Sequence, residues 1–415
     1  MTDLPLAFRY ITQSLTDYID FTRLDEAEYT RNRGVQVSSF RDYKLVKYDR
    51  NRIASDNVAT LGLWRSVIIR NGKIVCVAPP KATSLSSFMR TYSASDGKIQ
   101  LEEFVEGTMI NVFWDGDDWE MASRSLIGAN GFYYKNSPTF RKMFLEANSR
   151  NIEFTLLDKR LIYSFVVCHP CNRLVAPLKT PHLYLVEVLS VLPDGRVGSV
   201  DMEATENGAV LEYVKTKALT PKRYPFPEEI EPEDAEYYAS STSSRPSPSP
   251  PAPNSYEAIQ YRYASNKTPF YKMGVILRGG ANGERTKMRN PVYEFVRALR
   301  NNSHKLLYQY LHLRVTDRLG AFLRFYPEYI SEFRGFQLQI HDFTARMHET
   351  YMNVFVKRSL AFDEVDKSLK PHLSALNKIY LDSLQDAKRV ITKKEVIQYV
   401  NRLDPERLMY ALTHN

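Results

Sequence analysis

EEFVEGTMINVFWDGDDWEMASRSLIG, residues 102–128, is the stretch that decides the fold. Within 110–123, two runs rich in β-branched and aromatic residues flank a polar turn from Asp115 to Asp118. Such runs around a glycine-containing turn are typical of an antiparallel β-hairpin. The stretch therefore predicts a sheet at the centre of this part of the chain.

Further local signals lie on both sides of this hairpin. Asn71-Gly72 separates two β-rich runs in residues 68–78, and Asp194-Gly195 does the same in residues 188–200. Ser137-Pro138, followed by FRKMFLEA, offers an N-cap serine and a first-turn proline for one helix. The first part of the chain is therefore predicted to be an α+β domain built on antiparallel sheets.

The region of about 228–256 differs in composition from the sequence around it. It begins acidic and becomes rich in serine and proline from Ser240 to Ser255, with little apolar side chain to offset the entropy lost on ordering. We expect a disordered insertion here. Strand-like sequence returns at YKMGVILRG (271–279) and ERTKMR (284–289), so we expect one N-terminal domain over residues 1–289 with the insertion inside it.

From Asn290-Pro291, an N-cap and first-turn pair, the apolar residues follow a helical period. They recur at three- and four-residue steps in 336–351 and in 373–384. Thr392 and Glu395 have the spacing of a capping box. We therefore expect an all-helical C-terminal domain over residues 290–415, with its aromatic stripes packed in the core.

Composition narrows the class of protein. No run in the 415 residues approaches the roughly 18 apolar residues of a membrane span, and the N-terminus lacks the pattern of a secretory signal. Three cysteines favour a reducing compartment over a disulfide framework. The formal charge of +8 is compatible with a polyanionic partner. We expect a cytoplasmic protein, in the host cytoplasm or the virion if viral, without a membrane partner.

Four segments, in this order, resemble the RNA ligase family of T-even phages and its relatives in large DNA viruses: residues 61–81, 102–128, 162–177, and 271–279 followed by 284–289. The resemblance implies a ligase-type nucleotidyltransferase fold. In that family a lysine attacks ATP, AMP moves to an RNA 5′-phosphate, and a 3′-hydroxyl then displaces it. The resemblance therefore also implies ATP or AMP and Mg²⁺ as cofactors, and RNA as a partner.

The catalytic motifs depart from the family pattern. The lysine of the family's Lys-x-Asp/Glu-Gly motif is Phe104 here, although Glu106 and Gly107 are kept, and phenylalanine cannot be adenylylated. Two further positions where the family has carboxylates are Ser164 and Met273. A lysine attacks phosphorus only when it is neutral and held in line, so these three losses predict a protein without adenylyl transfer.

The residues that remain are mostly basic. The resemblance implies a nucleotide- or RNA-binding role for Arg65, Lys81, Glu106, Gly107, Arg124, Lys287 and Arg289. The alternative interpretation of the cations is solvated charge at strand ends. Lys98 is a candidate replacement nucleophile, but it would require the chain to fold back. Lys47, in Lys47-Tyr48-Asp49-Arg50, lacks the glycine of the motif.

Cys168-His169-Pro170-Cys171 has the spacing of a metal or redox motif. A structural zinc site needs four ligands, and no second pair stands at a usual spacing. We interpret the segment as a turn closed by Asn172 and Arg173, and predict no metal site.

Three functions follow as hypotheses. The first is an RNA ligase-like protein that binds RNA, and nucleotide, but has lost adenylyl transfer. The second is an active ATP-dependent RNA ligase that uses a non-standard lysine. The third is a structural or assembly protein of a large DNA virus that reuses the fold, with protein partners at the helical domain and the Pro/Ser-rich segment.

Overall fold

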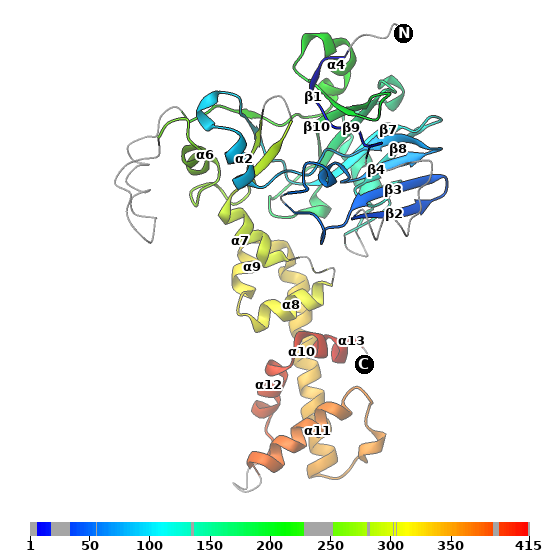
Figure 1. Ribbon diagram of the computed structural model, residues 1–415. Coiled ribbons are helices and arrows are strands. Elements are labelled where there is room, and N and C mark those ends of the chain that lie inside the picture. Colours follow the sequence, from blue (N-terminus) through cyan, green and yellow to red (C-terminus); the bar gives the residue numbers. More distant parts are fainter. Residues whose placement is uncertain are drawn as a thin grey trace. The chain divides into compact units, whose positions relative to one another are not determined.

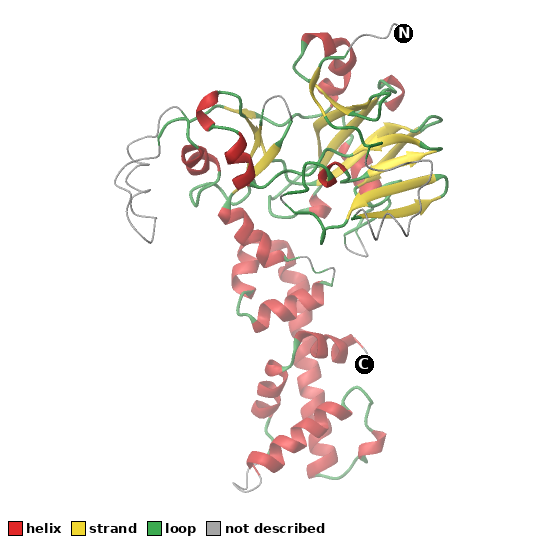
Figure 2. Ribbon diagram, viewed as in Figure 1, coloured by secondary structure: helices red, strands yellow, loops and turns green. Residues whose placement is uncertain are grey.

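The computed structural model describes residues 6–17, 34–54, 56–133, 137–227, 252–279, 283–301, 303, 305–384 and 390–413. The chain divides into two compact units, Met1–Glu294 and Phe295–Asn415. The division falls inside helix α7 (Pro291–Arg300). Among the described residues, strands occur before α7 and helices alone after it (Figure 1, Figure 2).

Three antiparallel sheets form the frame of the first unit. Sheet A has the strand order β1-β11-β10-β9-β7-β8, sheet B the order β2-β3-β4-β5, and sheet C the order β12-β6-β13-β14. The strands are β1 (Phe8–Ile11), β2 (Val35–Phe40), β3 (Tyr43–Tyr48), β4 (Val67–Arg70), β5 (Lys73–Val77), β6 (Gln100–Glu103), β7 (Thr108–Trp114), β8 (Trp119–Ser123), β9 (Leu161–Cys168), β10 (His182–Val191), β11 (Val197–Val200), β12 (Arg223–Tyr224), β13 (Gly274–Arg278) and β14 (Arg285–Arg289).

The three predicted hairpins are confirmed. β4 and β5 pair around Asn71-Gly72, β7 and β8 around residues 115–118, and β10 and β11 around Asp194-Gly195. Asn71 has a φ of 51° and Gly72 a φ of 72°. A type I′ turn needs left-handed values at both central positions, which explains why this dipeptide closes the hairpin.

Sheet A is covered on both faces. On one face, Phe144 of α3 (Phe140–Ala147) and Leu211 of α4 (Gly208–Lys217) pack with strand residues such as Phe165. On the other face, residues of sheet B such as Ile68 share a core with Phe113. Sheet A is therefore the middle layer of the first unit.

Sheet C has a smaller core of its own. Phe88 of α2 (Leu85–Thr91) and Ile259 of α6 (Tyr256–Tyr263) pack against Leu101, Val275 and other apolar residues of the sheet. The strands that the sequence places before and after the expected insertion, β6 and β13, pair directly in this sheet.

The start of α3 differs from the prediction. Its N-cap is Thr139, whose hydroxyl accepts a hydrogen bond from the Lys142 amide at 3.2 Å, and not Ser137. A capping side chain must reach an amide two or three residues further on, and Thr139 stands at that distance from the first turn.

The expected insertion is too long at its C-terminal end. Residues 228–251 lie outside the described residues, but α6 begins at Tyr256 and is capped by Ser255. Tyr256 is buried, and its hydroxyl donates to the Tyr92 carbonyl at 2.7 Å. One aromatic residue with a cap before it is enough to anchor this end of the segment in the core.

The second unit is helical over its described residues, as predicted. α10 (Ile330–Tyr351) buries Ile340, Phe343 and Met347 at the predicted spacing. The capping box of α12 is also confirmed, because the Thr392 amide donates to the Glu395 carboxylate at 3.0 Å. The other helices are α8 (Leu306–Val315), α9 (Leu319–Phe325), α11 (Lys370–Ile379), α12 (Lys393–Arg402) and α13 (Pro405–Thr413). Across the described chain, no helix has the length and apolar character to cross a membrane.

Candidate functional site

A row of buried polar residues crosses sheet A. Asn111 of β7 pairs with Ser164 of β9, which in turn pairs with Glu187 of β10. Directly opposed residues of antiparallel strands point to the same face, so these side chains are neighbours. Ser164 Oγ donates to Asn111 Oδ1 at 2.8 Å, and Ser199 Oγ of β11 donates to Glu187 Oε1 at 2.5 Å. Ser164, where the resemblance predicts a carboxylate, therefore lies beside one.

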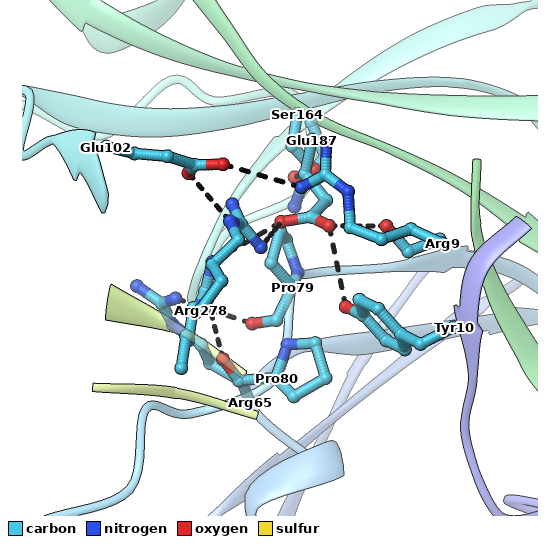
Figure 3. A network of polar contacts seen from close by, with 12 residues as sticks. Arg9, Tyr10, Arg65, Pro79, Pro80, Glu102, Ser164, Glu187 and Arg278 are labelled. Carbon is cyan, nitrogen blue, oxygen red and sulfur yellow. Dashed lines mark hydrogen bonds and ion pairs between the residues drawn. The ribbon is translucent and has the colours of Figure 1, made fainter. Parts of the chain in front are cut away.

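Glu187 is the centre of a buried ion network between sheets A and C (Figure 3). Its Oε2 lies 3.0 Å from Arg278 Nη1 and 3.5 Å from Arg285 Nη1. Arg278 Nε also lies 2.6 Å from Glu102 Oε2, and Arg9 Nη1 lies 3.6 Å from Glu102 Oε1. Burial raises the pKa of Glu187, but the arginines outweigh this effect and lower the pKa to about 2. The network is therefore ionised at neutral pH.

Sequence reasoning missed Glu187. The available signal was one charged residue inside the mostly apolar run from Leu183 to Val191. A lone acid in such a strand is rarely buried unless it is paired. The arginines that pair with it belong to β13 and β14, far along the chain, so the pairing could not be read from the strand itself.

Basic residues gather around Phe104. Lys287 Nζ lies 4.8 Å from the centroid of the Phe104 ring, and Arg289 Cζ lies 5.5 Å from it. Both cations belong to β14, where residues two apart point to the same face. The face of an aromatic ring attracts cations, so the phenylalanine at the family's lysine position holds two of them. Arg289 is exposed and also pairs with Glu294 at 2.6 Å.

The environment of Lys287 disfavours its charge. Burial lowers the pKa of Lys287 to about 7, and four neighbouring cations add to the effect of burial: Arg285, Arg65, Arg289 and Lys81. Within the described part of the chain, its amine forms no hydrogen bond or ion pair with a carboxylate. An amine in such surroundings regains its charge when an anion binds beside it. We call Lys287, Arg285, Arg65, Arg289 and Lys81 the cationic cluster.

Two members of the cationic cluster are anchored on consecutive carbonyls. Arg65 Nη1 donates to the Pro79 carbonyl at 3.4 Å, and Arg285 Nη2 donates to the Pro80 carbonyl at 2.7 Å (Figure 3 shows Arg65 and both prolines). Burial lowers the pKa of Arg65 to about 10, which still leaves its guanidinium charged at neutral pH. The turn before Lys81 therefore fixes two cations in place.

The remaining basic candidates take separate positions. Lys81 lines a cavity of about 310 Å³ together with Arg285. Arg124 Nε donates to the Arg65 carbonyl at 3.4 Å, so Arg124 contacts the cationic cluster from the end of β8. Lys98 is exposed in the loop before β6.

Glu106 and Gly107 hold a loop in place. The Glu106 carboxylate accepts from the amides of residues 174–176 at distances from 2.9 to 3.3 Å. Both of its oxygens accept hydrogen bonds from backbone amides, whereas the resemblance implies that Glu106 binds a ligand. Gly107 has a φ of 154°, and a Cβ there would lie 2.4 Å from the Val167 carbonyl oxygen. Glycine is required by this close approach of two backbones.

The segment from Cys168 to Arg173 is a turn, as predicted. Asn172 Nδ2 donates to Thr108 Oγ1 at 2.7 Å, and Arg173 donates to the Val175 carbonyl. The Cys168 thiol is buried and donates to the Glu106 carbonyl, and burial raises its pKa to about 12. A thiol with a raised pKa is inert at neutral pH, so this cysteine has a structural role.

The carboxylates of Glu187, Glu102 and Glu106 do not suit Mg²⁺. That ion takes oxygen ligands in near-octahedral geometry, usually one or two carboxylates with waters and phosphates. Glu187 and Glu102 are bound to arginines, Glu106 is bound to amides, and Ser164 and Met273 supply no carboxylate. Over the residues that the structure describes, no group of three or more His, Cys, Asp or Glu side chains could hold a metal ion.

Comparison with known proteins points to one relative. An alignment of 106 positions, which covers 23% of this chain, is 29% identical to the RNA ligase of Rhodothermus phage RM378. Part of this chain is similar to a phage RNA ligase. The similarity covers 24% of the length of that ligase, and no protein-family model matches the chain. The protein is therefore RNA ligase-like in sequence over this stretch.

The similarity of this chain to solved structures is weak. An archaeal ATP-dependent RNA ligase aligns over 94% of this chain and 76% of its own, with 11% identity and a TM-score of 0.38. A protein of Aquifex aeolicus assigned as an ATP-dependent DNA ligase aligns over 86% of this chain and 79% of its own, with 12% identity and a TM-score of 0.37. Scores this low do not establish a common fold. This chain has an α+β fold, with antiparallel sheets and a helical C-terminal region.

Proposed function

We propose that this RNA ligase-like protein binds RNA, and nucleotide, through phosphate groups at the cationic cluster, without transferring an adenylyl group. The observation that carries the proposal is the Lys287 amine, which lies among four cations and has no carboxylate partner in the described chain. A phosphate at this position would offset the mutual repulsion of the cations and form charge-assisted hydrogen bonds with them. The similarity to a phage RNA ligase supports RNA as the source of that phosphate.

The absence of adenylyl transfer rests on three positions. Phe104 occupies the place of the attacking lysine and holds Lys287 and Arg289 by its ring. Ser164 and Met273 supply no carboxylate, and the nearby Glu187 is held by arginines. A charge-neutralising metal would therefore lack ligands from these residues.

Binding of a fluorescent, 5′-phosphorylated single-stranded RNA tests the proposal. The wild-type chain is expected to bind it with an affinity that falls as salt rises, because phosphate contacts release counterions. Lys287→Ala should weaken binding by at least several-fold, whereas Lys142→Ala, on the exposed face of α3, should not. A wild-type chain that shows no binding to RNA would contradict the proposal. It would favour the third hypothesis, a structural or assembly protein of a large DNA virus.

For the active-ligase hypothesis, one lysine is a specific candidate for the nucleophile. Lys287 is the amine beside Phe104, and its lowered pKa leaves a substantial neutral fraction at pH 7 to 8. In this second candidate function, Lys287 Nζ attacks the α-phosphorus of ATP and a P–N bond forms. The bond from the α-phosphorus to the bridging oxygen breaks, pyrophosphate leaves, and the amine proton passes to solvent.

Incubation with radiolabelled ATP separates the two candidates. A chain without adenylyl transfer retains no label on a denaturing gel. A covalent label that maps to Lys287 by mass spectrometry and disappears in Lys287→Arg, but not in Lys98→Arg, would establish the second candidate and overturn the first.

A further inference from the structure

A second group of cations continues from Arg65 onto sheet B. The guanidinium of Arg124 lies 4.7 Å from the centroid of the Tyr48 ring, while its Nε donates to the Arg65 carbonyl. Tyr48, at the end of β3, is buried, so its ring is a fixed platform under the guanidinium. Lys47 Nζ of the same strand lies 3.3 Å from Ser125 Oγ. Arg124 therefore connects the cationic cluster to β3.

The cations of this second group disfavour one another's charge. Burial lowers the pKa of Lys47 most, and the charges of Arg124 and Arg50 lower it further. Burial also lowers the pKa of Arg124, and Arg50 adds to that effect. The nearest acid in sequence is Asp49, but its Oδ1 accepts from the Asn51 amide at 3.0 Å and closes its own turn. For the described residues, no ion pair neutralises Lys47, Arg50 or Arg124.

We infer that Lys47, Arg50 and Arg124, here called the β3 track, bind the sugar-phosphate backbone of an RNA strand whose terminal phosphate lies at Lys287. The inference rests on the proposed function and extends it from one phosphate to a path along the protein. A set of like charges without ion-pair partners among the described residues is an electrostatic cost that a polyanion offsets. Lys47 and Arg124 contact Ser125 and Tyr48, whereas Lys287 contacts Phe104, so the two groups of cations have different surroundings. A strand with a phosphate at each nucleotide can contact both groups.

The test compares three proteins of equal length. They are the wild-type chain, the triple variant Lys47→Gln, Arg50→Gln and Arg124→Gln, and a control triple variant Lys142→Gln, Lys179→Gln and Lys217→Gln. The two triple variants lose the same charge, but the control residues lie outside the β3 track. The probes are 5′-phosphorylated RNAs of about 4 and about 16 nucleotides, which bracket the usual footprint of a single-strand site. AMP and ATP are titrated in parallel.

The triple variant of the β3 track should bind the long RNA at least tenfold more weakly than wild type. The slope of log affinity against log salt should fall by about 2, since each lost phosphate contact removes about 0.7 for a single strand. The loss of affinity for the short RNA and AMP should be several-fold smaller than the loss for the long RNA, because Lys287 is retained. The control variant should bind every probe nearly as wild type does. Thermal unfolding of each variant establishes that the fold is intact.

Other outcomes overturn the inference in distinguishable ways. If wild type and the β3-track variant bind the long RNA equally, the β3 track does not bind RNA. The cationic cluster then remains the proposed RNA site. If the β3-track variant loses ATP binding but binds the long RNA as wild type does, the β3 track binds the triphosphate of ATP and not an RNA strand. No RNA binding by the wild-type chain overturns the proposed function and the track together.

Discussion

Glu187 of β10 lies directly opposite Ser164 of β9, with both side chains on the same buried face of sheet A. The resemblance to RNA ligases predicts a carboxylate at the position of Ser164. The structure has a carboxylate one strand away, and Arg278 and Arg285 of sheet C bind it. A negative charge therefore lies next to Ser164, but this charge joins two sheets and is buried.

This arrangement predicts that the missing carboxylate cannot simply be restored. Ser164→Glu would bury a second carboxylate beside Glu187, and a buried charge without its own partner is costly. We expect the free energy of unfolding to fall by roughly 2 to 4 kcal/mol, as measured by urea denaturation. Ser149→Glu, at an exposed position, should change it by less than about 0.5 kcal/mol. A stable Ser164→Glu protein would mean that the polar row has room for a second acid.

Glu187 should be among the most sensitive residues of the first unit. Glu187→Gln leaves two buried arginines without their carboxylate, and we expect a loss of about 3 to 5 kcal/mol at pH 7. The pKa of Glu187 in the folded state, about 2, lies below the ordinary value, so its contribution is present above pH 4.5 and is lost as the pH falls toward 2. The difference between wild type and Glu187→Gln should therefore shrink in acid. Asp194→Asn, in an exposed ion pair with Arg196, should change the stability far less than Glu187→Gln does.

Lys287 should have the opposite effect on stability. Its folded-state pKa, about 7, lies below the ordinary value of a lysine, so the unfolded chain holds more protons between pH 7 and about 10. The stability of the wild-type chain should rise with pH over this window. Lys287→Met should be more stable than wild type at pH 6 and equally stable near pH 10. The difference at pH 6 should be roughly 1 to 2 kcal/mol, because solvent partly screens the charge of this partly exposed amine. Lys142→Met, which removes an exposed lysine of α3, is the matched control.

The titration of Lys287 should also change the affinity for RNA. An RNA whose 5′-phosphate is blocked as a methyl ester keeps a terminal phosphate for Lys287, and all of its phosphates are diesters, which do not titrate near neutrality. Its affinity should rise as the pH falls from 8 to 6, because the protonated Lys287 amine attracts a phosphate and the neutral amine does not. Lys287→Arg should abolish this dependence, since an arginine stays charged over the whole range. A wild-type affinity that is flat from pH 6 to 8 would contradict a phosphate contact by Lys287.

Restoring the family's lysine should not restore its chemistry. Phe104→Lys replaces a ring that attracts Lys287 and Arg289 with another cation, so we expect a loss of about 1 to 3 kcal/mol of stability. We also expect no lysyl-AMP adduct by intact-mass measurement after incubation with ATP, because Ser164 and Met273 still supply no carboxylate. Phe104→Leu, which keeps an apolar side chain, should lose about 1 kcal/mol or less. An adduct on the introduced lysine of the Phe104→Lys protein would show that the remaining residues suffice for adenylyl transfer.

The sequence by itself determined the features that depend on near neighbours. Asn71-Gly72 closes its hairpin because both residues adopt left-handed φ, and the Thr392–Glu395 capping box forms because its partners are three residues apart. The apolar spacing of α10 likewise indicates which face is buried. The resemblance of residues 104–107 to the family's Lys-x-Asp/Glu-Gly motif also depends on consecutive residues alone. Each of these inferences needs a few consecutive residues and no knowledge of the rest of the chain.

The tertiary structure alone decided the electrostatics. Glu187 finds its arginines on two strands of another sheet, and the Glu106 carboxylate is taken up by amides of residues 174–176. The pKa of Lys287 depends on four cations from three separate segments of the chain. Burial and Coulomb interactions act through space, so residues far apart in sequence determine them. For this reason the sequence could name Lys287 as basic, and only the fold shows that it is an amine without a carboxylate partner among the described residues.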